Sequence, residues 1–595
     1  MAAPSTRTAA AAKSAALAAP GRSSRWGRVA ATVKDLVAGD LRYPCISNVI
    51  LISIALPLIS IAFMIPALVT RSTLQQGMLF NVGYEVIRLL ADWLSNLFSS
   101  FYYVQMASIP KFEGAGQLSA AGAFVLYGSL GAFVLGGLTG LVNIGVAEPL
   151  LQALAPPHAD DDLLTSVALS ATRIIGLFVP ARIVITNMSG IMCGQSSSNF
   201  ALVVPVYACS LGFSLIAAAV MIAIFDASGC KDMLRAANAS AYEAALASAN
   251  GSSLADSPLP FSPEDWVCPA AETALIDASW VESLNAWLGV VLLLGIMLIV
   301  STRRGYFTEH GCNLRAYANA ALTKVDGEDD DDDGVDDGGG RGGLARMCTT
   351  AFVAVNVRSL LNNSRELVTP LAATKIGIAE AAAVNFFEAL SYISYGVPNV
   401  CALGVMAIGA RLLGARRKRD FRRLVHVHVG FAVTSAAAAL MIASLSFESN
   451  LEKDFINEVD YATFKPLANE LWPIAAAMQP LRALVGVYGP ILMACQGFVE
   501  WGVTVTLLTF LVYVPLTVAG SVAGDVKVLV GANLAYNLAH FLALAYLVHW
   551  RLLPKLTKEG SDKVAPADAS ADASSGGAAD KAFGRGKVAP CTASR

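Results

Sequence analysis

The clearest pattern in the sequence is an alternation of long apolar runs with short polar connections. A helical run of about 20 apolar residues is long enough to cross the ~30 Å hydrocarbon core of a lipid bilayer. Twelve segments of this kind occur, near residues 47–69, 83–108, 121–154, 164–190, 199–225, 284–302, 350–375, 380–411, 422–446, 468–496, 499–519 and 526–550. We therefore predict an all-α integral membrane protein with twelve transmembrane helices.

The composition agrees with this pattern and narrows the function. Of the 595 residues, 55% are hydrophobic and 15% are charged, whereas soluble chains carry roughly 25% charge. The HExxH, GxSxG and Walker-type sequences of common enzymes do not occur, and the six histidines form no ligand set. We predict a protein of the lipid bilayer that is not an enzyme and has no metal site, no cofactor and no nucleic-acid partner.

A polar tract divides the twelve segments into two sets of six. Residues 303–347 include an Asp- and Gly-rich stretch, 326–340, whose charge density prevents a packed core. We predict a solvated cytosolic linker here. It would join an N-lobe at residues 45–302 to a C-lobe at residues 348–550.

The chain ends and the charged connections predict an orientation. Residues 1–44 have the composition of either an organellar transit peptide or a disordered tail, and residues 551–595 of a disordered tail. Lys and Arg gather in the connections on one side, most densely at residues 415–423. Since positively charged connections face the cytosol, both termini are predicted to be cytosolic or stromal. The choice between a plastid envelope and a plasma membrane or endomembrane stays open.

The longest connection on the opposite side, residues 226–281, contains candidate modification sites. Asn238 and Asn250 each begin an Asn-x-Ser sequence, which accepts glycans in secreted loops. Cys230 and Cys268 lie in the same loop and would form a disulfide if the loop faces an oxidising compartment.

The two halves resemble each other at an offset of about 300 residues. The corresponding residues include Met106 and Met406, Gly114 and Gly414, and Arg182 and Arg482. Because this offset equals six spans, both halves cross the membrane in the same direction. We predict two six-helix lobes related by a parallel pseudo-two-fold repeat, an arrangement found in transporters that rock two lobes about a central site.

Three segments are similar to one transporter family. Residues 470–485, ELWPIAAAMQPLRALV, resemble the tenth-span signature of the multidrug and toxic compound extrusion (MATE) transporters. The stretch from around Arg358 through residues 373–377 resembles the seventh span of the DinF-like and plant plastid branch, and residues 180–194 resemble the fourth span. The resemblance implies a secondary transporter that exports amphipathic organic or xenobiotic molecules by alternating access, as an antiporter of H⁺ or Na⁺. We expect a monomer.

One departure from the family moves the expected ion site. Family members often carry an acidic residue in the first span, but residues 47–69 contain none. A charge in hydrocarbon costs about 2.5–3.5 kcal/mol, so an intramembrane carboxylate needs a partner or a function. Glu366 is the first candidate for binding the coupling proton or cation, and Glu388 is the second. The alternative for each is a purely structural ion pair with a residue of another helix.

Further polar residues in the spans are candidates for a substrate cavity. They are Asn362, Arg365, Asn385, Arg182 and Arg482. The repeat-related Arg182 and Arg482 would face an anionic substrate or pack against backbone carbonyls. A lipid-linked substrate flippase of the same superfamily is the alternative function, and a cavity rich in Arg and Lys would favour it. The mixed charges of these candidates favour MATE-type export.

Overall fold

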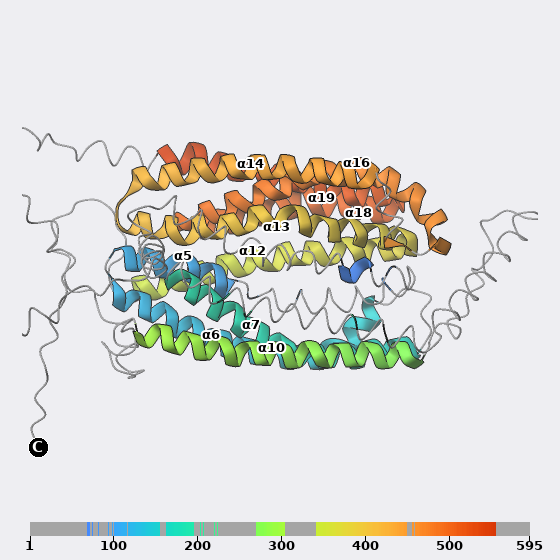
Figure 1. Cartoon of the computed structure of the whole chain (residues 1–595), viewed down its shortest axis with the longest axis horizontal. Coiled ribbons are helices and arrows are strands. Elements are labelled where there is room, and N and C mark those ends of the chain that lie inside the picture. The colour runs from blue at the N-terminus through green and yellow to red at the C-terminus, as the bar shows by residue number, and fades with distance from the viewer. Residues whose placement is uncertain are drawn as a thin grey trace, which may run out of the picture.

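The structure is a computed structural model of the whole chain. It describes residues 100–154, 162–195, 269–303, 341–448 and 458–554, residue 116 excepted, and a few isolated positions elsewhere. Every element within these ranges is a helix, as the sequence predicted (Figure 1).

The helices follow the predicted spans closely. They are α5 (Ser100–Gly114), α6 (Leu118–Leu154), α7 (Asp162–Gln195), α10 (Pro269–Arg303), α12 (Arg341–Ile376), α13 (Ile378–Gly414), α14 (Lys418–Glu448), α16 (Glu458–Ala494), α17 (Phe498–Leu508), η3 (Thr509–Tyr513), α18 (Val514–Ala523), α19 (Val526–Tyr546) and η4 (Leu547–Leu552). The elements from α12 onward cover all six predicted spans of the C-lobe. In the N-lobe, α6, α7 and α10 match spans three, four and six, and α5 is the end of span two.

Some predictions fall outside the described residues or differ from what they contain. The first and fifth predicted spans lie mostly outside them, and so do Cys230, Cys268, Asn238 and Asn250. Helix α12 begins at Arg341, within the predicted linker 303–347. The residues Leu344–Met347 are good helix formers, which allows α12 to extend beyond its apolar part.

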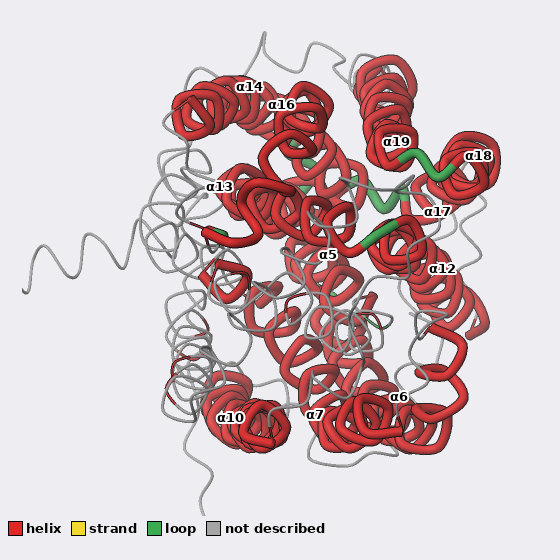
Figure 2. Tube along the Cα trace, turned by 90° about the vertical axis from the view of Figure 1, so that its right-hand side faces the viewer, coloured by secondary structure: helices red, strands yellow, loops and turns green. Residues whose placement is uncertain are grey.

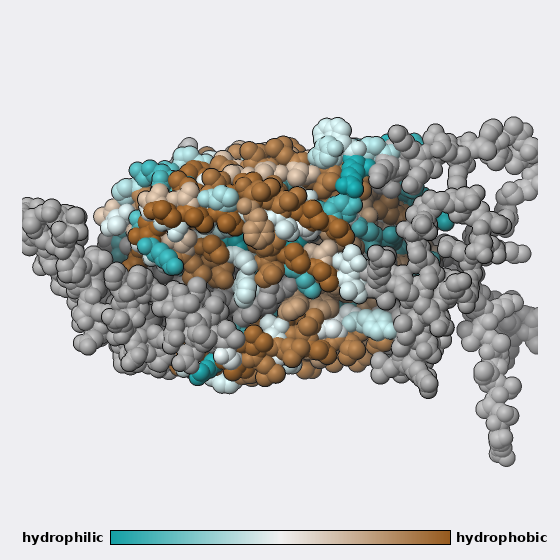
Figure 3. All heavy atoms as spheres, turned by 180° about the vertical axis from the view of Figure 1, so that it is seen from behind, coloured by the Kyte–Doolittle hydropathy of each residue, from teal (hydrophilic) through white to brown (hydrophobic). Residues whose placement is uncertain are grey.

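The outer surface of the described helices is strongly apolar. Leu141, Val291 and Leu511 are between 65% and 71% exposed. By length and composition, five helical stretches in the described part can cross a membrane: Ala120–Gly145, Thr172–Gln195, Ser279–Val300, Phe498–Ala523 and Val526–Leu552. On the face in Figure 3, apolar residues cover the middle of the described surface and polar residues gather nearer its ends. A wide exposed apolar surface of this kind suits contact with lipid.

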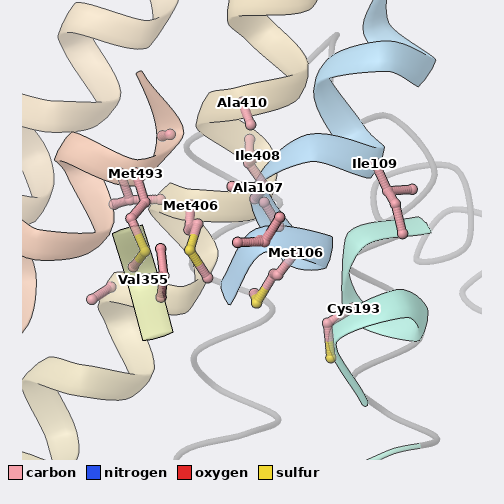
Figure 4. Packing of buried hydrophobic residues seen from close by; sticks show 14 of the residues in the cluster. Met106, Ala107, Ile109, Cys193, Val355, Met406, Ile408, Ala410 and Met493 are labelled. Atoms are coloured by element: carbon pink, nitrogen blue, oxygen red, sulfur yellow. The ribbon is translucent and has the colours of Figure 1, made fainter. Parts of the chain in front are cut away.

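The helices form two groups joined by α5 (Figure 2). Helices α5, α6, α7 and α10 make one group, and α12 to α19 make the other. Helix α5 packs against both α7 and α13. One buried apolar cluster includes residues from both groups, and Figure 4 shows the repeat-related Met106 and Met406 close together within it. Apolar packing therefore holds the two groups together at the end of the molecule where α5 and α13 terminate.

Two repeat-related glycines make the crossing of α5 and α13 possible. A side chain at Gly114 would collide with the carbonyl oxygen of Arg411, and one at Gly414 would collide with the carbonyl oxygen of Lys111. Residues 111 and 411, like 114 and 414, are separated by the repeat offset. The two helices thus approach each other with the reciprocity that a pseudo-two-fold axis requires.

The C-terminal ends of α5 and α13 share one turn geometry. Arg417 N–H donates to the Leu412 carbonyl at 2.8 Å, and Gln117 N–H donates to the Phe112 carbonyl at 2.8 Å. This six-to-one bond closes a helix in the Schellman manner. Both pairs again differ by 300 residues, so the turns α5–α6 and α13–α14 are structural equivalents. The sequence repeat therefore corresponds to a structural one.

Candidate functional site

Polar side chains within the apolar C-lobe converge on a cavity of about 240 Å³. It lies among α12, α13, α16, α17 and α19, and one residue of α5 reaches it from the other group of helices. Its lining consists of Tyr103, Arg358, Asn362, Asn363, Arg365, Glu366, Glu388, Tyr392, Arg482, Val485, Gly486, Pro490, Trp501, Asn537 and His540. Five polar residues of this set come from α12, more than from any other helix.

The two carboxylates in the cavity have different partners. Arg482 donates from its two terminal nitrogens to the two oxygens of Glu388, at 2.7 and 2.6 Å. This bidentate pair joins α16 to α13, and both side chains are mostly buried, at 14% and 23% exposed. Such geometry compensates both charges locally. The Glu388 charge is therefore neutralised within the lobe.

Glu366 is compensated much less. Its Oε1 accepts one hydrogen bond from Asn362 Nδ2 at 3.0 Å and lies 3.9 Å from a terminal nitrogen of Arg365. Its side chain is 40% exposed, toward the cavity that it lines. Arg365 and Glu366 are consecutive residues of one helix, so their side chains leave it about 100° apart and do not face each other. Glu366 thus presents a carboxylate to the cavity.

Arg365 is held by α19. Its guanidinium donates to Asn533 Oδ1 at 2.9 Å and to Asn362 Oδ1 at 3.2 Å, and it lies over the Tyr536 ring at 4.4 Å. The side chain is 5% exposed. These contacts point the guanidinium toward α19, which leaves Glu366 without a close ion pair.

A π-helical segment supports the same region of α12. The segment η3 (Thr509–Tyr513) interrupts the span made by α17 and α18. Its Tyr513 hydroxyl lies 2.9 Å from the Arg365 carbonyl oxygen, to which it donates, and 2.7 Å from the Thr369 hydroxyl. Asn533 Nδ2 donates to the same Thr369 hydroxyl at 2.9 Å. Interruptions of this kind often accompany functional sites, and here Tyr513, the last residue of η3, contacts α12.

Arg358 lines another part of the cavity, where its guanidinium lies against two aromatic rings. Its guanidinium carbon lies 4.0 Å from the ring centroid of Trp501 and 5.4 Å from that of Tyr103. The Trp501 indole N–H donates to His540 Nε2 at 3.1 Å. Because indole nitrogen only donates, His540 Nε2 carries no proton in this arrangement and the imidazole is neutral. Tyr103 comes from α5, so this part of the cavity involves both groups of helices.

The structure brings together five of the seven intramembrane residues predicted for the site. Glu366, Glu388, Asn362, Arg365 and Arg482 line the cavity. Asn385 and Arg182 are not among its lining residues. Asn385 is 7% exposed and donates to Asn81 Oδ1 at 3.1 Å, and Arg182 lies over the Phe178 ring at 5.3 Å. The repeat-related Arg182 and Arg482 therefore have different surroundings.

Sequence reasoning missed Arg358, Trp501 and Tyr103 as cavity residues. A signal for Arg358 was present, because Arg358, Asn362 and Arg365 follow the i, i+4, i+7 spacing of one helix face. The two aromatic residues carry no comparable signal, since such side chains are common in apolar spans.

In the described part of the chain, no group of three or more His, Cys, Asp and Glu residues is placed to hold a metal ion. The carboxylate, guanidinium, amide and aromatic side chains that line the cavity are suited to binding ions and polar groups.

Comparisons with known proteins agree on the fold. Residues 355–519 match the model of the MatE family. The structure is similar to that of the eukaryotic MATE transporter AtDTX14, with a TM-score of 0.60, 10% identity, and coverage of 87% of this chain and 98% of that one. It is also similar to an outward-facing multidrug resistance MATE family transporter of the MOP superfamily, with a TM-score of 0.60, 10% identity, and coverage of 88% and 98%.

A third similar structure is a D35N mutant of the Vibrio cholerae MATE transporter VcmN, with a TM-score of 0.55, 15% identity, and coverage of 84% and 97%. No curated protein sequence matches the chain. At these identities, the structural matches establish the fold.

Proposed function

We propose that this chain, whose residues 355–519 belong to the MatE family and which has the MATE fold, is a secondary active transporter that exports small organic molecules in exchange for H⁺ or Na⁺. Proteins of this family are transporters and not enzymes. The single observation that carries the coupling proposal is the unequal compensation of the two carboxylates in the cavity.

Glu366 is the residue that we assign to the coupling ion. A carboxylate in a membrane interior that lacks a close positive partner gains free energy by taking up a proton or cation. Glu366 meets this description, with one amide hydrogen bond and an Arg365 nitrogen 3.9 Å away. Glu388 is the second candidate, but ion binding there would have to displace Arg482 from two short hydrogen bonds.

Alternating access fits the way the two groups of helices meet. They are in contact where α5 crosses α13, and this contact includes an ion pair of 2.7 Å between Glu113 and Arg411. Arg411 also donates to the carbonyl of Gln195, on α7, at 2.7 Å. Rocking of the lobes would have to break these contacts. The basic turn 415–423 adjoins them, so we assign this closed end to the cytosolic or stromal side.

The orientation completes the proposed arrangement. We propose that both termini face the cytosol or stroma, the side to which the closed end is assigned, and that the lobes are the predicted ranges 45–302 and 348–550. The apolar outer surface supports contact with lipid around the described helices, and we propose that one chain is the working unit.

The test of this function is gradient-driven transport in proteoliposomes. The probes are 2-naphthoate and 2-naphthylmethylammonium, which share a ring system and differ in charge. A proton or a sodium gradient is imposed across membranes that contain wild type, Glu366→Gln or Glu470→Gln. Glu470 is the matched control because it lies in an exposed pair with Lys527, at 55% and 48% exposed.

Wild type and Glu470→Gln should accumulate a probe when one gradient is imposed and not in its absence. Glu366→Gln should lose most of this accumulation, because an amide cannot take up the proton or balance the cation. Accumulation by Glu366→Gln equal to wild type would refute the assignment of Glu366. Equal movement with and without both gradients would refute coupled transport.

A lipid-linked substrate flippase remains the second candidate function. Three arginines line the cavity against two glutamates, and this excess of positive charge suits a phosphate headgroup. The volume of about 240 Å³ favours a small molecule instead, since it lies below the roughly 300–1,000 Å³ typical of ligand pockets. Movement of a labelled anionic lipid between leaflets, abolished by Arg358→Gln, would favour the flippase.

A further inference from the structure

We infer that the part of the cavity around Arg358 binds an anionic group, a carboxylate or a phosphate, carried by a ligand with a flat apolar part. The inference rests on the proposed function only in taking this cavity as the substrate site. It goes further in assigning the charge of the ligand and the residue that recognises it.

The first support comes from hydrogen bonding. Three buried donor groups of cavity residues find no acceptor among the described residues: Arg358 Nε, Asn363 Nδ2 and Arg365 Nε. All three are on α12. No acceptor atom of a cavity-lining residue is in the same situation within the described part. A buried donor without an acceptor costs about 1–3 kcal/mol. The three nitrogens are covered by protein atoms, so they indicate an excess of donors over acceptors along this part of α12, which a ligand that brings acceptors would complement.

The second support is charge. The cavity contains the guanidinium groups of Arg358, Arg365 and Arg482 and the carboxylates of Glu366 and Glu388. Arg482 is paired with Glu388, and Arg365 has amide partners and lies 3.9 Å from Glu366. Arg358 has no carboxylate within ion-pair distance in the described residues, and the neutral His540 adds no charge. The lining therefore has one more guanidinium than carboxylate, and Arg358 is the guanidinium that has no carboxylate within 4 Å among the described residues.

The third support is the shape and polarity of the surroundings. Trp501 and Tyr103 lie against the Arg358 guanidinium with ring centroids at 4.0 and 5.4 Å, and the two rings are 6.5 Å apart at a steep angle. An Arg held over aromatic rings keeps its planar set of donors available for a bidentate contact with a carboxylate or phosphate. The rings themselves offer apolar faces to a flat ligand.

The experiment measures binding to the purified full-length protein in phosphatidylcholine nanodiscs by isothermal titration calorimetry. Three ligands share one ring system: anionic 2-naphthoate, neutral 2-naphthamide and cationic 2-naphthylmethylammonium. The variants are Arg358→Gln, which removes the charge, and Arg358→Lys, which keeps the charge but loses the planar donors. Arg423→Gln removes a positive charge at a site that is 62% exposed and serves as the control.

Wild type and Arg423→Gln should bind 2-naphthoate at least tenfold more tightly than 2-naphthamide, and 2-naphthylmethylammonium most weakly. Arg358→Gln should bind 2-naphthoate about as weakly as 2-naphthamide, and Arg358→Lys should fall between. Unchanged 2-naphthamide binding in Arg358→Gln would show that the cavity is intact. Tighter binding of the cation than of the anion by wild type would overturn the inference, and so would unchanged 2-naphthoate binding in Arg358→Gln.

A second arm separates a soluble anion from a lipid headgroup. Phosphatidic acid is added to the nanodiscs, and 2-naphthoate is titrated again. Unchanged affinity assigns the site to a soluble organic anion, whereas a several-fold loss that Arg358→Gln abolishes assigns the same donors to an anionic headgroup. Either result supports an anion site. Failure of gradient-driven transport with intact 2-naphthoate binding would refute the proposed function and leave this inference standing.

Discussion

At the scale of single residues, the structure distinguishes two cavity carboxylates that the hydropathy pattern of the sequence cannot tell apart. Glu366 and Glu388 were both predicted from their position within apolar spans. The structure gives Glu388 two hydrogen bonds from Arg482 and leaves Glu366 with one from an amide. This difference depends on α16 lying beside α13, which no local pattern in the sequence specifies.

The first prediction concerns the stability of the buried ion pair. Glu388→Gln should lower the free energy of unfolding by about 3–5 kcal/mol, because Arg482 keeps a buried charge without its anion. Glu366→Gln should lower it much less, because Glu366 has only one close polar contact. Steric trapping in bicelles measures both values. The double variant Glu388→Gln, Arg482→Gln should regain part of the loss, and equal losses for the two single variants would contradict this account.

At the scale of elements, much of the fold could be predicted and the partners of the polar residues could not. Apolar runs and the repeat offset located the C-lobe helices, because span length and small-residue contacts such as Gly114 and Gly414 are local properties of the sequence. The cavity depends on Tyr513, Asn533 and Trp501, which reach α12 from helices more than 100 residues away along the chain. Their contacts follow from how the helices pack in the C-lobe.

The region of the turn between α13 and α14 gives two stability predictions. Substitution by glycine should stabilise the protein at one position and destabilise it at a nearby one. Arg416 has a positive φ of 57°, a conformation that costs a non-glycine residue free energy. Arg416→Gly should therefore raise the free energy of unfolding by about 0.5–1 kcal/mol. Arg423, an exposed residue of α14 beyond its first turn, is helical, so Arg423→Gly should lower it by about 1 kcal/mol. Thermal unfolding of the detergent-purified protein measures both, and a loss of stability in Arg416→Gly would contradict the assignment.

At the scale of the whole molecule, the account depends on two lobes that separate at their closed end. Glu113 and Arg411 form an ion pair between α5 and α13, with side chains 10% and 13% exposed. Breaking it should favour a state in which this end is open. The free Cys495 lies in the adjoining turn between α16 and α17 and reports on that opening.

Arg411→Gln should therefore increase the rate at which a maleimide labels Cys495, measured for the Cys495 peptide by mass spectrometry. Arg423→Gln lies at the same end of the molecule, in an exposed position, and should leave the rate unchanged. An unchanged rate in Arg411→Gln would mean that the ion pair does not hold the lobes together.

The central claim is that Glu366 couples an ion gradient to substrate movement, and one measurement addresses it most directly. For the naphthyl probe that wild type carries, gradient-driven accumulation is compared with exchange between equal concentrations of probe inside and outside the vesicles. Exchange requires binding and lobe movement, but it requires no net ion flow. Glu366→Gln should retain exchange and lose accumulation. Loss of both activities together, or retention of both, would contradict the assignment of Glu366 to the coupling ion.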